Sequence, residues 1–422
     1  MHTEAFLVDA PMDQIVSHAG LHARHAGKAW IRKALADARE RTLRLLNAYE
    51  SVLGPTLTVP HSPELNPPLW EAGHIGWFAD WWIARNPGRF LGTALNPSQP
   101  REAARQASEG WDADALYNSS TVPHATRWTL NLPDVNTTRH HLTSSLQETL
   151  EWLDVAPEND QGLYFFRLAL FHEDMHGEAA LYMAQTLGID PGDIDRPSFA
   201  ALPETSPPLT LAAQTWQLGY DGPGFAFDNE RQAHSVALDG GEIDAQVVTW
   251  GQYLPFIEDG GYDNAHLWSP EGWAWRQGGP HRWPRHLRPA PFSTGWEVCR
   301  FGRWEALCTT EAACHLNAHE AHAWCRWTGR RLPTEAEWEA AACTLPGFTW
   351  GQVWEWTGSA FAPYPGFETH PYADYSAPWF DGRPVLRGAS PATAARMRHP
   401  RYRNYFPASR TDIYAGFRSM AA

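Results

Sequence analysis

Apolar residues in the first half of the chain recur at intervals of three and four, which is the period of an amphipathic helix. Segment 28–53 shows this period most clearly. Three further segments predict helices: 66–87, which opens with prolines, 137–156, and 161–188, which ends at a glycine suited to a C-cap. Four long helices joined by polar connections favour a four-helix bundle.

The pattern changes after the fourth of these helices. Residues 190–210 are rich in proline and polar side chains, which is typical of a linker between domains. Beyond them, glycine, proline and tryptophan separate short segments. The clearest helical pattern there is a helix–turn–helix over 318–342, with Pro333 at the start of its second helix. These patterns predict an α+β protein, with a helical bundle over residues 1–200 and a loop-rich domain of short strands over 201–422.

The composition is that of a globular protein, with 43% hydrophobic and 19% charged residues. A formal net charge of −15 argues against nucleic acid or an anionic membrane as a partner. The sequence has no apolar run long enough to span a membrane and no secretory signal, so we expect a cytoplasmic protein. The five cysteines form no C-x-x-C pair and are expected to be reduced and buried: Cys299, Cys308, Cys314, Cys325 and Cys343.

Residues 171–183, FHEDMHGEAALYM, contain an H-E-x-x-H motif formed by His172, Glu173 and His176. Residues four apart on a helix lie on one face, so the two imidazoles can hold one metal ion. In a zinc protease of the zincin type, the glutamate activates a water molecule and a third ligand follows downstream. The sixth position after His176 is Tyr182, and no suitable ligand follows it closely. This absence weakens the protease interpretation.

His74 lies on the second predicted helix and is the candidate third ligand, because neighbouring helices of a bundle can direct side chains to one point. Three neutral imidazoles would leave one face of the ion open to O2 and to a soft substrate atom, and they are compatible with Fe(II), Cu or Zn. Glu173 and Glu178 either orient the imidazoles or are solvated. Other histidines are expected at the surface or at helix caps, such as His140, His141, His315, His319 and His322.

Several segments together resemble a known enzyme family. His74 with HEDMHGE is similar to the three-histidine site of DinB-type helical bundles. GRRLPTEAEWEAAA, VWEWTGS, VLRGAS and RYRNYFPASRTDIYAGFR resemble the formylglycine-generating-enzyme fold, which is C-type-lectin-like. In this order, with FAFDNERQAHSVAL opening the second part, they resemble the ergothioneine-synthase type of non-haem iron sulfoxide synthase over nearly all of the chain.

The resemblance implies an O2-dependent enzyme that joins a sulfur or selenium nucleophile to C2 of hercynine, the Nα-trimethylated betaine of histidine. It implies that Fe(II) is held by His74, His172 and His176. The segment RYRNYFP would enter the mouth of the bundle, where aromatic faces suit a trimethylammonium group that has no N–H to donate. The implied substrate contacts are Met175, Asn404, Tyr405, Phe406 and Arg410, with Tyr405 as the catalytic residue and Tyr402 and Tyr117 as further candidates for the proton donor.

Departures from the ergothioneine-synthase pattern bear on the identity of the donor. A YNSYY-like stretch is replaced by LYNSSTV, with Ser120 and Thr121 in place of its final tyrosines. Met175 stands where a glutamine is common, and Phe406 stands where some relatives that use γ-glutamylcysteine have an aspartate. These features look most like the selenoneine-synthase branch, whose donor is a selenosugar, a 1-seleno-N-acetylhexosamine. The alternative is a sulfoxide synthase that couples cysteine or γ-glutamylcysteine to hercynine.

Three other classes of protein share part of these features. A formylglycine-generating enzyme needs a copper-binding cysteine pair near the C-terminal segments, and no cysteine follows Cys343. A zinc thiol transferase of the DinB kind would use the same histidines but would leave the second domain without a role. A glycan-binding module would fit the tryptophan-rich second half, and it predicts that ligand binding survives loss of the histidines.

Overall fold

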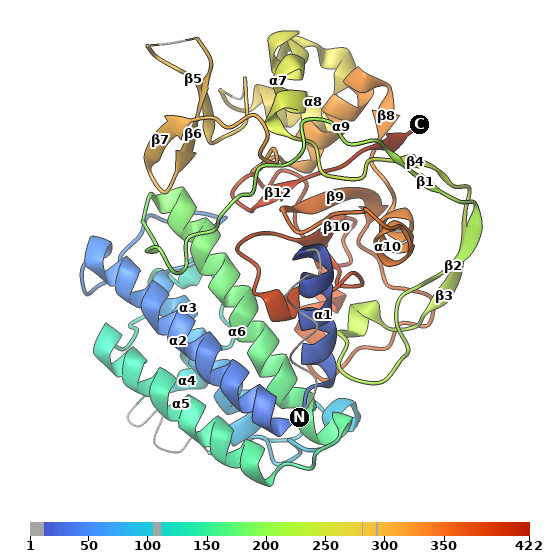
Figure 1. Cartoon of the computed structure of the whole chain (residues 1–422). Helices are drawn as coiled ribbons and strands as arrows, with labels where there is room; N and C mark the ends of the chain where they lie inside the picture. Colours follow the sequence, from blue (N-terminus) through green and yellow to red (C-terminus); the bar gives the residue numbers. More distant parts are fainter. Residues whose placement is uncertain (1–11, 104–110, 281, 293) are drawn as a thin grey trace.

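The computed structural model describes residues 12–103, 111–280, 282–292 and 294–422 (Figure 1). Its helical half lies beside a half built from short strands, loops and shorter helices (Figure 1). The chain passes from one half to the other between α6 (Asp160–Leu187) and β1 (Leu209–Leu211). The predicted boundary at residue 200 falls within this connection.

The four predicted long helices are present and pack as a bundle (Figure 1). Asp134 caps the N-terminus of one helix by accepting from the Thr137 N–H, and Asn159 caps another by accepting from the Gly162 N–H. Gly188 adopts the left-handed conformation that ends the last helix. The bundle consists of α2 (Lys28–Leu53), α3 (Pro68–Ala79) with a π-helical turn (Asp80–Ala84), α5 (Val135–Val155) and α6.

The sequence patterns did not predict α1 (Met12–His25) or α4 (Ala113–Tyr117). α1 packs against the second half of the chain, beside a 3-10 turn at Ala395–Met397 (Figure 1). Arg24, near the end of α1, forms a buried ion pair with Glu230. α1 therefore links the N-terminal part of the chain to the second half, outside the bundle.

Short strands form small sheets in the second half, with helices packed around them (Figure 1). The helix–turn–helix predicted over 318–342 is present, but its second helix begins at Glu335, because Thr334 rather than Pro333 precedes it as the cap. Two of the helices in this half, α7 and α8, have only nine and eight residues, too few for a clear period, and were not predicted. The helices are α7 (Trp250–Glu258), α8 (Pro270–Gln277), α9 (Ala318–Thr328) and α10 (Glu335–Thr344).

Two four-stranded sheets have the orders β1-β4-β13-β8 and β11-β10-β9-β12, a two-stranded sheet pairs β2 with β3, and a three-stranded sheet has the order β5-β6-β7. The central strand β9 runs antiparallel to β10 and parallel to β12, and β10 pairs with β11. The strands are β1, β2 (Gln214–Leu218), β3 (His234–Leu238), β4 (Gly241–Ile243), β5 (Leu287–Pro289), β6 (Trp296–Arg300), β7 (Arg303–Ala306), β8 (Arg330–Arg331), β9 (Val353–Ala360), β10 (Pro384–Ala389), β11 (Asn404–Tyr405), β12 (Ala415–Gly416) and β13 (Met420–Ala421).

Polar contacts join α6 to the sheet that contains β9. The Trp354 indole N–H and the Ser390 hydroxyl both donate to Oε1 of Glu178, at 2.8 and 2.7 Å. Arg396 pairs with Asp174 through two hydrogen bonds of 2.7 and 2.8 Å. These contacts fix α6, the helix that carries the H-E-x-x-H motif, against the second half of the chain.

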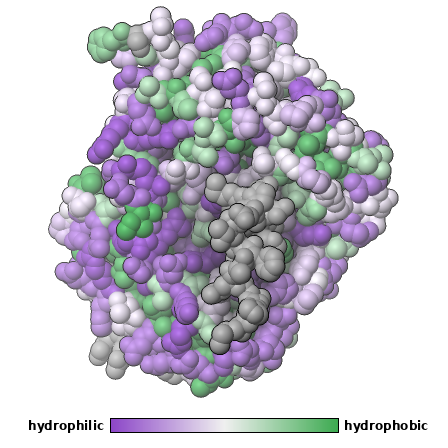
Figure 2. Space-filling model, in the orientation of Figure 1, coloured by the Kyte–Doolittle hydropathy of each residue, from purple (hydrophilic) through white to green (hydrophobic). Residues whose placement is uncertain are grey.

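The visible surface mixes polar and apolar residues, with hydrophilic side chains prominent on the helical half (Figure 2). Within the described residues, no helix combines the length and the apolar character that crossing a bilayer requires. All five cysteines are free, and Cys314 and Cys325 are buried. Cys308 and Cys343 are exposed, so the expectation of burial is wrong for these two.

Candidate metal centre and substrate cavity

Three histidines from two helices converge inside the bundle. His74 lies on α3, and His172 and His176 lie one turn apart on α6. Nε2 of His172 is 3.2 Å from Nε2 of His74 and 3.2 Å from Nε2 of His176. Imidazole nitrogens bound at about 2.1 Å to one metal ion lie roughly 3 to 3.5 Å apart, so these separations suit a shared ion. Among the described residues, this trio is the group of metal-ligand side chains close enough to hold one.

Hydrogen bonds and aromatic rings hold the imidazoles in this orientation. The Nδ1–H of His74 donates to the carbonyl oxygen of Tyr117 (2.8 Å), which leaves the lone pair on Nε2 for a metal. Nδ1 of His176 is paired with a carboxylate oxygen of Glu71. The ring of Phe78 stacks on His172 at 3.5 Å between centroids. Each side chain is therefore fixed before any metal binds.

Burial sets the protonation of the site. It lowers the pKa of His74 to about 3, with a further contribution from His176, and it lowers the pKa of His172 well below its usual value. Burial alone would raise the pKa of Glu71, but His176, His74 and Asn66 together lower it to about 2. His74 and His172 are thus neutral and Glu71 is ionised near neutral pH, as metal ligation requires. The donor set fits a divalent transition metal.

The glutamate of the H-E-x-x-H motif does not face the histidines. The guanidinium of Arg39 donates to both carboxylate oxygens of Glu173, at 2.8 and 3.1 Å, and the Thr42 hydroxyl donates to one of them at 2.8 Å. The Glu173 side chain therefore lies against α2 and cannot serve as the general base of a zincin. Neither Glu173 nor Glu178 orients an imidazole, because Glu173 binds Arg39 and Thr42 and Glu178 binds Trp354 and Ser390. Glu173 is also buried, so a solvated position is wrong for it.

Glu71 is the carboxylate that orients a ligand imidazole, and it was not predicted from the sequence. It stands three residues before His74 on α3, yet it pairs with His176 on α6. Its other oxygen accepts from the amide of Asn66. Nothing in the sequence near the H-E-x-x-H motif indicates this carboxylate, because the contact joins two helices about a hundred residues apart.

A cavity of about 230 Å³ lies between α6 and the C-terminal segment around β11. It brings Met175, Asn404 and Phe406, which were predicted to contact substrate, to the same space as His176. The full lining is Asn66, Glu71, Asp174, Met175, His176, Glu178, Ala179, Tyr182, Trp354, Met397, Tyr402, Asn404, Phe406 and Ile413. We call this space the interdomain cavity.

Tyr405 does not line the interdomain cavity. Successive side chains of a strand point to opposite faces, so Asn404 and Phe406 face the cavity and Tyr405 faces away. The Tyr405 hydroxyl donates to the carbonyl oxygen of Tyr375, and its ring stacks on Phe361 at 4.0 Å. The structure therefore does not bring the predicted catalytic residue to the histidines.

The other two tyrosine candidates differ in position. Tyr402 lines the interdomain cavity, where its hydroxyl accepts from Tyr375 (3.0 Å) and donates to the sulfur of Met175 (3.3 Å). The ring of Tyr117 is buried in the bundle against Gly73, where a Cβ atom would lie 2.1 Å from the ring. Of these two, only Tyr402 is placed to meet a substrate.

Tyr372 is a further tyrosine near the histidines, and sequence reasoning missed it. Its ring centroid lies 6.4 Å from that of His172 and 5.0 Å from that of Phe78. The adjacent segment is tied to the bundle by a short hydrogen bond from the Ser120 hydroxyl to Asp374. Burial raises the pKa of Tyr372, so its phenol stays protonated near neutral pH. Ser120 and Thr121 stand where relatives have tyrosines, and a tyrosine from the second half of the chain approaches the site instead.

Arg410 lies behind the cavity wall and is already neutralised. It donates two hydrogen bonds of 2.6 Å to Asp412, and its guanidinium lies 5.1 Å from the ring centroid of Phe406. The cavity lining itself contains the carboxylates of Glu71, Asp174 and Glu178 and, within the described part of the chain, neither lysine nor arginine. The cavity wall therefore suits cationic or uncharged ligands better than polyanions.

The remaining histidines only partly follow the expectation. His140 and His322 are exposed and His319 is half-buried. His141 and His315 are buried, with 1% and 6% of their surfaces exposed, so a surface or capping position is wrong for them. Both pack against aromatic rings, because each faces the interior of its half.

Comparison with known proteins agrees with this architecture. A family model for the sulfatase-modifying factor enzyme 1-like domain matches residues 208–351. The chain is 31% identical to the hercynine oxygenase of Mycolicibacterium smegmatis over 447 residues, covering 92% of this chain and 98% of that protein. It is 30% identical to the hercynine oxygenase of Mycobacterium tuberculosis over 436 residues, covering 91% and 96%. The mouse formylglycine-generating enzyme is 26% identical over 159 residues, covering 35% of this chain and 42% of that enzyme.

The fold and the site define a protein in which a helical bundle with a three-histidine centre is joined to a sulfatase-modifying-factor-type domain. The two hercynine oxygenases match along almost their whole length, through both halves of the chain. The chain belongs to the hercynine oxygenase family.

Proposed function

We propose that the protein is a non-haem Fe(II) enzyme that uses O2 to form a carbon–selenium bond at C2 of hercynine, on a path to selenoneine. The observation that carries the proposal is the convergence of His74, His172 and His176 beside the interdomain cavity. The names of the relatives support hercynine as the substrate and an oxygenase as the class of enzyme. The helical bundle is proposed to be of the DinB type, and residues 1–200 and 201–422 to form its two domains.

His74, His172 and His176 would hold Fe(II) through Nε2, with Glu71 fixing His176 from behind. Bound there, Fe(II) would supply the redox chemistry that O2 needs to react with a closed-shell substrate. In the overall reaction, the C2–H of hercynine, the Se–H of the donor and O2 give a selenoxide and water. One oxygen atom ends on selenium and the other in water, so the reaction balances at the selenoxide.

The interdomain cavity suits hercynine through its charge and its aromatic wall. Trp354, Tyr402 and Phe406 line it, and aromatic faces attract a trimethylammonium group. Glu178, which accepts only from the neutral donors Trp354 and Ser390, adds negative charge to the same wall, whereas Asp174 is paired with Arg396. The amide oxygen of Asn404 accepts from the Tyr405 N–H (2.9 Å), which leaves the NH2 group of Asn404 as its donor for the hercynine carboxylate.

The same wall favours a sugar over a thiol amino acid as the donor. The Asn404 amide is already assigned to the hercynine carboxylate, and cysteine would bring one further carboxylate and γ-glutamylcysteine two, each of which needs a cation or N–H donors in a buried site. The lining offers carboxylates instead, and Arg410 is engaged by Asp412. A selenosugar brings only hydroxyl and amide groups to this wall, and Phe406 offers a flat face for the sugar ring.

Two protonated phenols are positioned to move a proton during the reaction. Tyr372 approaches His172 from the second half, and Tyr402 lines the cavity beside Met175. Burial raises the pKa of both groups, so each phenol keeps its proton near neutral pH and would give it up only to a strongly basic group formed in the reaction. Tyr405 is absent from the cavity lining and its hydroxyl donates to the Tyr375 carbonyl oxygen, so it is not placed to take that part.

A competition between donors tests the proposal. Anaerobically prepared protein with Fe(II) and hercynine is offered the selenosugar, cysteine or γ-glutamylcysteine before O2 is admitted, and the products are identified by mass spectrometry. We expect a selenium-containing hercynine product from the selenosugar and much slower turnover with either thiol. Preference for cysteine or γ-glutamylcysteine would instead establish an ergothioneine-type sulfoxide synthase. Absence of hercynine oxidation with every donor would refute the proposed function altogether.

A further inference from the structure

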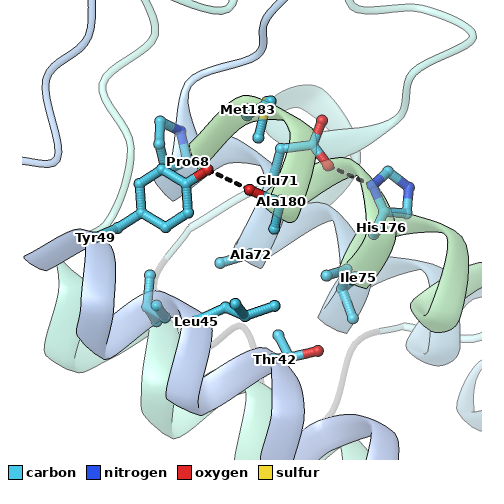
Figure 3. Close-up of a pocket in the computed structure, with 12 residues that line it drawn as sticks. Thr42, Leu45, Tyr49, Pro68, Glu71, Ala72, Ile75, His176, Ala180 and Met183 are labelled. Carbon is cyan, nitrogen blue, oxygen red and sulfur yellow. Dashed lines mark hydrogen bonds and ion pairs between the residues drawn. The ribbon is translucent and has the colours of Figure 1, made fainter. Parts of the chain in front are cut away.

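A second cavity lies inside the helical bundle and shares His176 and Glu71 with the lining of the interdomain cavity. Figure 3 shows it between α2, α3 and α6, with Leu45, Ala72 and Ile75 on its walls. Its volume is about 30 Å³, enough for a diatomic molecule. The lining is Thr42, Leu45, Leu46, Tyr49, Pro68, Glu71, Ala72, Ile75, His176, Gly177, Ala180 and Met183. We call it the bundle cavity.

The polar side chains of the bundle cavity already have hydrogen-bond partners. The Tyr49 hydroxyl donates to the carbonyl oxygen of Ala180 at 2.6 Å, a contact visible in Figure 3. The Thr42 hydroxyl contacts the Ala38 carbonyl oxygen and Glu173. Both oxygens of Glu71 are engaged, one by Asn66 and the other by His176. A water molecule needs two to four polar partners to be stable in a buried site.

Because the polar groups of the lining are already hydrogen-bonded within the protein, the bundle cavity favours a small apolar guest over water. Aliphatic side chains form most of its remaining surface, and they are buried: Leu45, Leu46, Ala72, Ile75 and Met183. Apolar cavities of proteins stay dry and accept xenon or small hydrocarbons. O2 is apolar and is smaller than these guests.

We propose that the bundle cavity holds O2 beside the metal centre and delivers it past the Glu71–His176 pair. Both residues line the bundle cavity and the interdomain cavity, so this pair is a wall that the two spaces share. The polar substrates would then occupy the interdomain cavity while O2 arrives through the bundle. This inference rests on the proposed function, because it assigns a route to the co-substrate of that reaction.

Xenon tests the cavity independently of any turnover. Xenon pressurisation of metal-free crystals, followed by anomalous diffraction, locates an apolar guest directly. We expect one xenon site in the bundle cavity of the wild-type protein and none in Leu46→Phe, whose added ring fills the space. Leu35→Phe is the matched control, because Leu35 lies on the same helix, is equally buried and does not line the cavity. It is expected to retain xenon. No xenon in the wild-type cavity would overturn the proposal.

Kinetics at varied O2 test the route. Leu46→Phe is expected to raise the KM for O2 by about fivefold or more while kcat at saturating O2 and the KM for hercynine stay near wild type, which is the pattern of impaired access. Leu46→Ala, which enlarges the cavity, is expected to bind more xenon without raising the KM for O2. An unchanged KM for O2 in Leu46→Phe, with xenon excluded, would overturn this inference alone. Absence of O2 consumption by the wild-type enzyme with every donor would overturn the proposed function and this inference together.

Discussion

Replacing His172 by alanine is expected to reduce O2 consumption in the presence of hercynine and donor to the background given by free Fe(II). His172 is the central member of the trio, with its Nε2 3.2 Å from the nitrogens of both partners, so its loss leaves two imidazoles that no longer surround an ion. Iron bound per chain should fall in parallel, measured on the desalted protein by metal analysis. An oxygen electrode and mass spectrometry of the product report the activity.

The control for this experiment is His140→Ala. His140 is an exposed histidine of α5, in the same bundle but remote from the trio, and its loss should leave iron content and turnover at the wild-type level. Far-ultraviolet circular dichroism should show equal helix content in both variants. Wild-type turnover in His172→Ala, with the iron retained, would rule out the three-histidine centre as the site of reaction.

Substitution of Glu71 by glutamine is expected to weaken Fe(II) binding by about 10- to 100-fold, the usual effect of losing a carboxylate that orients a ligand histidine. Glu71 is ionised and pairs with Nδ1 of His176, so it fixes the ring and makes its Nε2 more basic. The affinity is measured by competition with a chelator of known strength under anaerobic conditions. Turnover should recover when Fe(II) is supplied in excess, because no ligand has been removed.

Glu178→Gln is the matched control for Glu71→Gln. Glu178 also contributes a carboxylate to the interdomain cavity, but its Oε1 binds Trp354 and Ser390 rather than a histidine. Its substitution should leave Fe(II) affinity unchanged. An equal loss of affinity in both variants would show that the general negative charge of the cavity, rather than the contact with His176, supports the metal.

The helical part of the fold follows from sequence because its signals are local. The three- and four-residue period of the apolar positions and the glycine cap predicted the four long helices nearly to their ends. The spacing of His172 and His176 placed both imidazoles on one face of a helix. The position of His74 on a neighbouring helix then sufficed to suggest a third ligand.

The parts of the site that sequence did not reveal depend on contacts between distant segments. Glu71 reaches His176 across two helices, and Tyr372 reaches His172 from a loop two hundred residues later in the chain. Tyr405 was predicted to contact substrate, but the structure places its side chain outside the interdomain cavity, for a different reason. Within the short strand β11, neighbouring residues face opposite sides, and a motif alone does not say which side faces the bundle.

The arrangement also explains why the H-E-x-x-H motif is misleading here. In a zincin the glutamate of the motif acts on a metal-bound water, whereas Glu173 is held by Arg39 and Thr42 of α2. The carboxylate that supports the site comes from Glu71 on another helix. The H-E-x-x-H motif thus occurs both in zincin sites and in this three-histidine site. The side chain that binds the glutamate distinguishes the two.

The most direct test locates the metal itself. Crystals of protein loaded anaerobically with Fe(II) are measured on both sides of the iron absorption edge. We expect one anomalous peak, at bonding distance from Nε2 of His74, His172 and His176 and facing the interdomain cavity. Iron bound elsewhere in the chain, with these three nitrogens vacant, would contradict the proposed centre and the chemistry that follows from it.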